Sequence, residues 1–153
     1  MDGTNRDDLR FMQAAVDAAR AAGEKGEVPV GAAIVIGDEI VARAGNRTIV
    51  DCDPTAHAEM VALRETARKI GNYRLLGATL YVTIEPCAMC AGAMIQARIA
   101  RLVYGAEDAK GGAVRSCFNV LNSAQLNHRV EVTAGVMAEE AAGLLKDFFV
   151  ARR

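Results

Sequence analysis

Long apolar runs are absent from this 153-residue sequence. No stretch approaches the roughly 18 or more apolar residues that a membrane-spanning helix needs. The first eight residues, MDGTNRDD, carry several acids and lack the apolar core of a secretory signal peptide. From these two absences we expect a cytoplasmic protein that does not enter a membrane.

Internal repeats, low-complexity tracts and linkers rich in proline, glycine or serine are absent too. The composition, 52% hydrophobic and 24% charged, is close to the average of globular proteins and argues against disorder. A chain of this length can bury one sizeable core. We therefore expect residues 1–153 to form a single domain.

The chain has little net charge. Its formal value of −1 argues weakly against a nucleic-acid partner. The charges are unevenly distributed, because residues 60–129 hold nine Lys or Arg against four Asp or Glu, whereas the remainder holds nine against fifteen. The middle of the chain therefore presents either a basic face or ordinary surface charge, and both readings stay open on charge alone.

Hydrophobic periodicity predicts strands that alternate with helices after an initial hairpin. Thr4 or Asn5 is expected to cap the first helix and Thr55 the second, which should end at Gly71. This order of elements predicts a three-layer α/β/α fold, in which a central mixed five-stranded sheet carries helices on both faces. The helices are expected at 6–22, 56–70, 87–97 and 138–153, the strands at 30–36, 39–44, 79–84, 101–105 and 130–133, and a loop at 106–120.

The third expected strand stops at a proline that is followed by two cysteines. Proline is favoured in the first turn of a helix, so Pro86 indicates that a helix starts there. Cys87 and Cys90 would then lie on one face of its first turn, where the helix dipole favours thiolates. Four cysteines in a reducing compartment are more typical of metal ligands, catalysts or free thiols than of disulfides. These two could form half of a zinc site.

The other half of such a site needs a histidine or more cysteines, and the chain has two histidines. His57 lies at the start of the second expected helix and could join Cys87 and Cys90. Three protein ligands leave the fourth position of a tetrahedral zinc for water, as catalytic zinc requires. Glu59 could then move protons between that water and a substrate. A His-x-Glu motif followed by Pro-Cys-x-x-Cys is the signature of zinc nucleobase deaminases.

A closed structural zinc site is the alternative. It needs a fourth ligand, which Cys52 or Cys117 could supply, although neither has a cysteine partner nearby in the sequence. Otherwise these two are incidental thiols. The surroundings of His128 show no metal-ligand spacing, so we interpret it as structural.

Much of the chain resembles a known family. The stretches 27–35, 53–112, 127–136 and 144–153 are similar to the bacterial tRNA-specific adenosine deaminases, and the resemblance extends from about Phe11 to Arg153. The zinc motif alone marks the wider cytidine-deaminase-like superfamily. The segments EPCAMCAGAMI, YGAEDAKGG, NHRVEV and the terminal DFF are typical of the tRNA-editing branch.

The resemblance implies roles for residues outside the zinc motif. Asn46 would hydrogen-bond the flipped-out nucleoside, and the less favoured alternative is a turn residue at the hairpin end. Asp108 and Lys110 would touch the anticodon backbone and ribose, or form part of a solvated loop. Phe148 and Phe149 would help to line an RNA-binding cleft, and one of the two is expected in the core.

The resemblance also implies what the whole protein does. It would be a homodimer with one zinc per subunit that deaminates the wobble adenosine in a tRNA anticodon stem-loop to inosine. Two other functions stay open: zinc-dependent deamination of a free base, nucleoside or nucleotide, and a non-catalytic zinc-binding interaction domain. The interaction domain would require four protein ligands.

Overall fold

The computed structural model describes residues 6–152. The expected caps Thr4 and Asn5, and the last residue of the closing helix, Arg153, lie outside this range. The elements in chain order are α1 (Arg6–Glu24), β1 (Gly31–Ile36), β2 (Glu39–Gly45), α2 (Ala58–Ile70), β3 (Thr79–Ile84), α3 (Ala88–Ala97), β4 (Arg101–Ala106), β5 (Glu131–Ala134) and α4 (Ala138–Ala151).

The strands form one mixed five-stranded sheet in the order β2-β1-β3-β4-β5. β1 pairs antiparallel with both β2 and β3, whereas β3, β4 and β5 run parallel to one another. Parallel neighbours need a crossover, and α3 supplies it between β3 and β4. The carboxyl ends of β3 and β4 therefore meet at the same edge of the sheet, where α/β proteins usually bind ligands.

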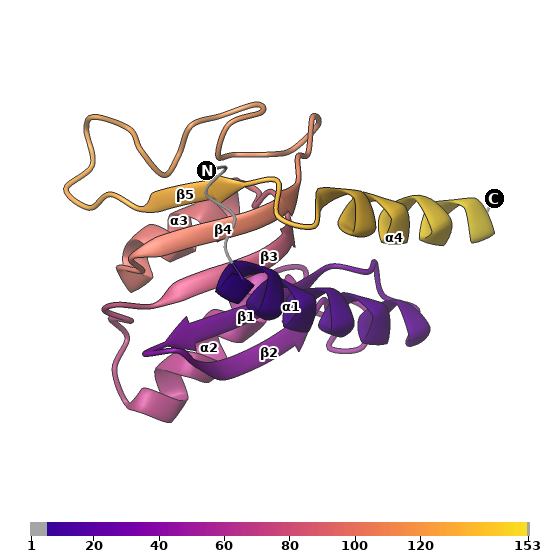
Figure 1. Cartoon of the computed structure of the whole chain (residues 1–153), viewed down its shortest axis with the longest axis horizontal. Coiled ribbons are helices and arrows are strands. Elements are labelled where there is room, and N and C mark those ends of the chain that lie inside the picture. Colours follow the sequence, from indigo (N-terminus) through magenta and orange to yellow (C-terminus); the bar gives the residue numbers. More distant parts are fainter. Residues whose placement is uncertain (1–5, 153) are drawn as a thin grey trace.

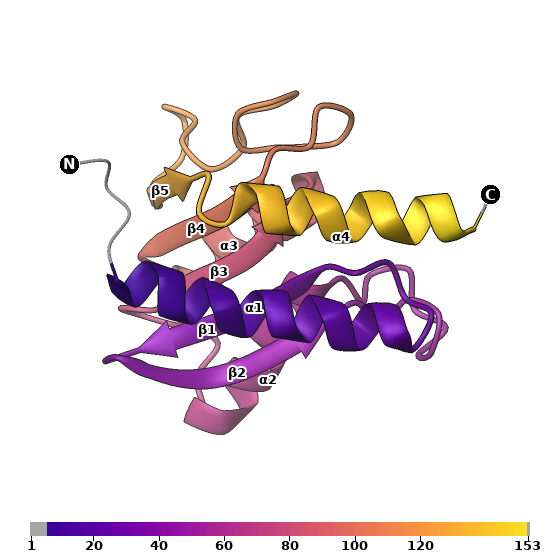
Figure 2. The same ribbon diagram turned by 45° about the vertical axis from the view of Figure 1, so that its right-hand side comes forward.

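Helices cover both faces of this sheet (Figure 1). α1 and α4 lie side by side on one face, as the turned view in Figure 2 shows, and α2 and α3 cover the other. Alternation along the strands explains the two cores, since successive side chains point to opposite faces. Ile34, Leu80 and Leu102 pack towards α2 and α3, while Val35 and Val103 pack towards α1. The predicted three-layer α/β/α fold is confirmed.

The alanine-rich α1 lies unusually close to the first strand. A Cβ atom on Gly31 would stand 2.0 Å from the backbone oxygen of Ala15, so only glycine fits there. This close approach lets α1 pack directly against β1.

The helices α2 and α3 begin later than expected. α3 starts at Ala88 with Cys87 as its N-cap, so Pro86 precedes the helix instead of occupying its first turn. α2 starts at Ala58 with His57 as its N-cap, and the prediction that Thr55 caps it is wrong. The Thr55 hydroxyl instead donates to the Asp53 carboxylate at 2.7 Å, which closes a local turn before the helix.

A buried ion pair joins α1 to the start of β4, at the end of the parallel strands away from their carboxyl ends. Asp8 of α1 is 1% exposed and accepts two hydrogen bonds from Arg101, the first residue of β4, at 2.9 and 2.8 Å. The Tyr81 hydroxyl donates to the same carboxylate at 2.7 Å.

Within residues 6–152, no helix is both long enough and apolar enough to cross a membrane.

Candidate metal centre

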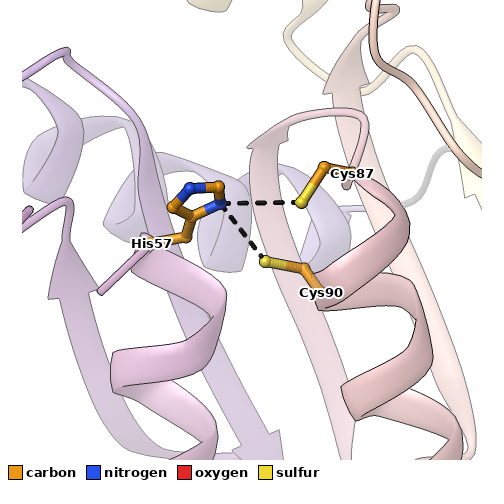
Figure 3. Close-up of side chains that lie close together, drawn as sticks. All are labelled: His57, Cys87 and Cys90. Carbon is orange, nitrogen blue, oxygen red and sulfur yellow. Dashed lines mark hydrogen bonds between the residues drawn. The ribbon is translucent and has the colours of Figure 1, made fainter. Parts of the chain in front are cut away.

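Two helix starts bring the metal-ligand candidates together. His57 directly precedes α2 and Cys87 directly precedes α3, and both have extended backbone conformations as N-caps. Cys90 lies in the first turn of α3 and is completely buried. In Figure 3 the His57 ring faces both sulfur atoms across the space between the two helix starts.

The distances in this cluster suit a single metal ion. The His57 Nδ1 atom lies 3.6 Å from the Cys87 Sγ atom and 3.5 Å from the Cys90 Sγ atom. Typical zinc–nitrogen and zinc–sulfur bonds at a tetrahedral angle place the two ligand atoms about 3.6 Å apart. The donor atoms of all three residues fall within 4.8 Å of one another. One imidazole and two thiolates are also a donor set that suits zinc.

The remaining cysteines and histidine lie outside this cluster. Among the described residues, the group that could hold a metal comprises His57, Cys87 and Cys90 without a fourth His, Cys or carboxylate. Cys52 and Cys117 are exposed, and each thiol contacts a carbonyl oxygen of its own loop. His128 contacts the Ile99 carbonyl oxygen through Nε2 at 2.7 Å, a structural role.

The local electrostatics favour a thiolate at the start of α3. The Cys90 thiol and the backbone N–H groups of Cys90 and Met89 stabilise the charged form of Cys87, and they lower its pKa to about 5. The hydrogen bond between the Cys90 and Cys87 side chains, together with burial, raises the pKa of Cys90. A metal ion that binds both sulfurs would displace the proton that remains on Cys90.

Glu59 lies in the first turn of α2 beside the ligands. It is only 3% exposed, and burial raises the pKa of its carboxyl group, with the negative charge of Cys87 adding to the effect. A raised pKa makes a carboxylate a better proton acceptor, which suits a group that accepts and returns a proton.

His57, Cys87 and Glu59 line a cavity of about 400 Å³, and the fully buried Cys90 does not reach its surface. A larger groove of about 900 Å³ runs along β2 between α1 and α2, but none of the three ligand residues lines it, so size does not identify the site. The smaller cavity is lined by Val28, Val30, Asn46, His57, Glu59, Ile84, Glu85, Cys87, Asp108, Leu145 and Phe149.

Three of the five substrate-binding candidates, Asn46, Asp108 and Phe149, line the same cavity as His57 and Cys87. Asn46 lies at the wall, and its Oδ1 atom accepts the Ala58 N–H at 3.0 Å, which anchors the start of α2. Asp108 also lines the wall and accepts the N–H groups of Lys110 and Gly111 through Oδ1, each at 3.1 Å. Lys110 itself is exposed and is not among the lining residues.

Neither phenylalanine of α4 is a core residue. Phe149 lines the cavity and is 52% exposed. Phe148 is half-buried, meets the Phe149 ring edge-on with centroids 5.3 Å apart, and carries the Arg152 guanidinium over its face. The expectation that one of the pair is buried is wrong, because α4 ends where the sheet no longer covers its inner side (Figure 2).

Two buried acids that sequence analysis missed hold the loops around the cavity. The Glu27 carboxylate accepts the Thr48 hydroxyl and the N–H groups of Ile49 and Val50, in the loop that leads to His57. The Glu85 carboxylate likewise accepts the N–H groups of Asp108 and Arg115, in the loop after β4. Burial alone would raise the pKa of Glu85, but hydrogen bonds from Ser116 and from backbone N–H groups lower it to about 2. For Glu85 the available signal was an acid that directly follows the apolar strand β3, whereas Glu27 lies between α1 and β1.

Comparisons with known proteins assign the chain to a family. The model of the MafB19-like deaminases matches residues 6–153. The tRNA-specific adenosine deaminase of Haemophilus influenzae is 50% identical over 147 residues, which cover 95% of this chain and 85% of the relative.

Solved structures agree with this assignment. A structure from a study of A-to-I editing by tRNA:A34 deaminases at the wobble position superposes with a TM-score of 0.86 and 47% identity, covering 89% of this chain and 99% of that one. The guanine deaminase of Nitrosomonas europaea has the same fold at 23% identity, with a TM-score of 0.81 over 93% of this chain and 84% of that one. The chain belongs to the MafB19-like deaminase family and to the tRNA-specific adenosine deaminases.

Proposed function

We propose that this protein is a zinc-dependent hydrolase that converts the wobble adenosine of a tRNA anticodon to inosine and releases ammonia. The observation that carries the proposal is the cluster of His57, Cys87 and Cys90 beside the buried Glu59, at the base of a cavity. The family to which the chain belongs supplies the substrate class.

His57, Cys87 and Cys90 would hold the zinc ion. When bound there, zinc supplies a Lewis acid that lowers the pKa of water from 15.7 to about 7. Glu59 accepts a proton from the attacking water and passes protons to the purine ring and to the departing amine. The oxygen of water bonds to the carbon that carries the amino group, the bond from that carbon to nitrogen breaks, and ammonia leaves.

The cavity walls would position the nucleoside. Asn46 already accepts the Ala58 N–H through Oδ1, so its amide nitrogen is the atom that can donate to the substrate. Phe149 offers an exposed ring against which a single-stranded base can stack. Asp108 and Lys110 would contact the anticodon backbone and ribose beside the cavity. An anticodon loop suits this arrangement because its bases unstack at low cost.

The assembly and location belong to the same proposal. The helix α3 carries no charged residue, and its sequence AMCAGAMIQA leaves apolar side chains partly exposed on the side away from the sheet. A face of this kind suits a homodimer interface, which tends to be depleted in charge. We propose a homodimer in the cytoplasm, where tRNA is available.

The deciding experiment offers the zinc-loaded protein an anticodon stem-loop with adenosine at the wobble position, and scores inosine and ammonia. Parallel reactions contain free adenosine, cytidine and guanine. We expect inosine in the stem-loop, at a rate that falls steeply with added salt because phosphate contacts are screened. Faster, salt-independent ammonia release from a free base would replace this function with small-molecule deamination. No release from any substrate would favour a non-catalytic zinc module.

A further inference from the structure

Glu85 lies between the metal ligands and the loop that follows β4. It directly precedes Pro86 and Cys87, and its backbone N–H donates to the Ala106 carbonyl at the end of β4. Its side chain is 2% exposed and lines the cavity that contains the ligands. A buried carboxylate needs hydrogen-bond donors, and the loop at 107–116 provides them.

Residues at both ends of the loop donate hydrogen bonds to this one carboxylate. The Asp108 N–H, near the start of the loop, donates to Oε1 at 3.1 Å, and the Ser116 hydroxyl donates to the same oxygen. At the end of the loop, the N–H groups of Val114, Arg115 and Ser116 donate to Oε2 at 3.1, 2.8 and 2.9 Å. Hydrogen bonds to a charged acceptor are stronger than those between neutral groups.

The loop sequence is adapted to the carboxylate. A Cβ atom on Gly112 would stand 2.4–2.5 Å from the carboxylate atoms of Glu85, so only glycine fits at this position. The next residue, Ala113, donates its N–H to the Pro86 carbonyl at 2.8 Å. The loop is therefore attached to the same short segment that leads into α3.

We propose that Glu85 is a positioning residue for the RNA substrate, because it sets where Asp108 lies on the cavity wall. This inference rests on the proposed function. Asp108 is held through its own backbone N–H by Glu85, and its side chain organises the turn that contains Lys110 and Gly111. Removing the Glu85 charge releases this whole turn.

The expected effect is on substrate binding more than on chemistry. The three ligands lie at the starts of α2 and α3, and Glu59 lies in α2. The loop meets the start of α3 through the Ala113 N–H bond to the Pro86 carbonyl, a backbone contact that the Glu85→Gln change does not remove. A loosened loop should therefore raise KM for the stem-loop while zinc content and kcat change little. A general loss of structure would instead lower zinc content, thermal stability and kcat together.

The test compares Glu85→Gln with Glu107→Gln in the zinc-loaded protein. Gln keeps the length of the side chain, but its NH₂ group meets N–H donors that previously met an oxygen. Glu107 is exposed in the same loop, so its variant makes the same charge change without touching the carboxylate cluster. For Glu85→Gln we expect KM to rise at least about tenfold, the factor that corresponds to one lost hydrogen bond of this kind, with kcat within about threefold of wild type. Glu107→Gln should keep the wild-type KM or lower it.

Hydrogen exchange supplies a readout that is independent of activity. The amides of Asp108 and residues 114–116 should lose protection in Glu85→Gln and keep it in Glu107→Gln. If Glu85→Gln fails to fold, Ser116→Ala, which removes one of the donors, should raise KM in the same direction by a smaller factor.

The outcomes separate this inference from the proposed function. An unchanged KM in Glu85→Gln, or an equal rise in Glu107→Gln, overturns the inference while wild-type editing upholds the function. If the wild-type protein leaves the stem-loop unchanged, the proposed function fails and the inference fails with it.

Discussion

Asn in place of Asp8 should destabilise the fold strongly without touching the chemistry. Asp8 is 1% exposed and receives two hydrogen bonds from Arg101 and one from Tyr81. The Asp8→Asn variant leaves the guanidinium without its carboxylate. Breaking a buried ion pair in this way costs about 3–5 kcal/mol, and we expect about 3 because the Arg101 side chain is still 20% exposed. For a chain of this size the midpoint of thermal unfolding should fall by roughly 6–12 °C.

A neighbouring pair provides the matched control. Asp7 contacts Arg10 at 3.5 Å in the same helical turn, but the two side chains are 64% and 61% exposed. Asp7→Asn makes the identical chemical change, and it should alter the free energy of unfolding by less than about 1 kcal/mol. Urea and thermal unfolding of the zinc-loaded variants measure both effects. Equal losses in the two variants would refute the argument that burial decides the strength of the pair.

The pH dependence offers a second check on Asp8. Burial alone would raise the pKa of its carboxyl group, but the hydrogen bonds from Arg101 and Tyr81 and the Arg101 charge hold it below its usual value. A depressed pKa in the folded state contributes stability that is present above the unfolded pKa, about 3.9, and is lost as the pH falls through the folded value. The stability gap between wild type and Asp8→Asn should therefore be constant near neutrality and shrink below about pH 4.

Three further predictions concern the site and the packing. Glu59→Ala should retain zinc but lose at least about 10²-fold in kcat, and normal turnover in this variant would contradict its role in proton transfer. His57→Ala should lose the metal, and full zinc content by elemental analysis would contradict its role as a ligand. Phe149→Ala should raise KM for the stem-loop by roughly 5- to 150-fold with an unchanged melting temperature, if its ring stacks on a base. Gly31→Ala should yield a poorly folded protein, since its Cβ would enter the backbone of α1. Gly143→Ala in α4, whose Cβ would meet nothing within 4 Å, should keep the melting temperature or raise it slightly.

The metal-ligand candidates were predictable because each is encoded locally. His57, Cys87 and Cys90 lie beside helix starts that short-range signals such as Pro86 and the apolar strand before it already indicate. The strands were predictable for the same reason, since alternation and turn residues act over a few positions. The starts of α1 and α4 were predicted at the right residues, whereas those of α2 and α3 were predicted two residues and one residue early. At α2 the Thr55 hydroxyl bonds the Asp53 carboxylate in its own turn instead of capping the helix.

Contacts between distant parts of the sequence were not predictable in this way. Asp8 and Arg101 are separated by 93 residues, and Glu85 binds a loop that begins more than twenty residues later. No local pattern distinguishes Asp8 from the exposed Asp7 beside it. Only the packing of α1 over the sheet decides which of the two carboxylates is buried, and a single sequence contains no direct signal of that choice.

The two buried acids that hold loops have a common consequence for binding. Glu27 holds the loop before α2 and Glu85 holds the loop after β4, each through several backbone N–H groups. Loops held in this way lose little conformational entropy when a ligand binds, so more of the contact energy appears as affinity. The conformational cost then falls on the RNA, whose unpaired loop bases can leave their stack cheaply. A rigid cavity that faces a flexible substrate would thus favour a single-stranded anticodon loop over a base-paired helix.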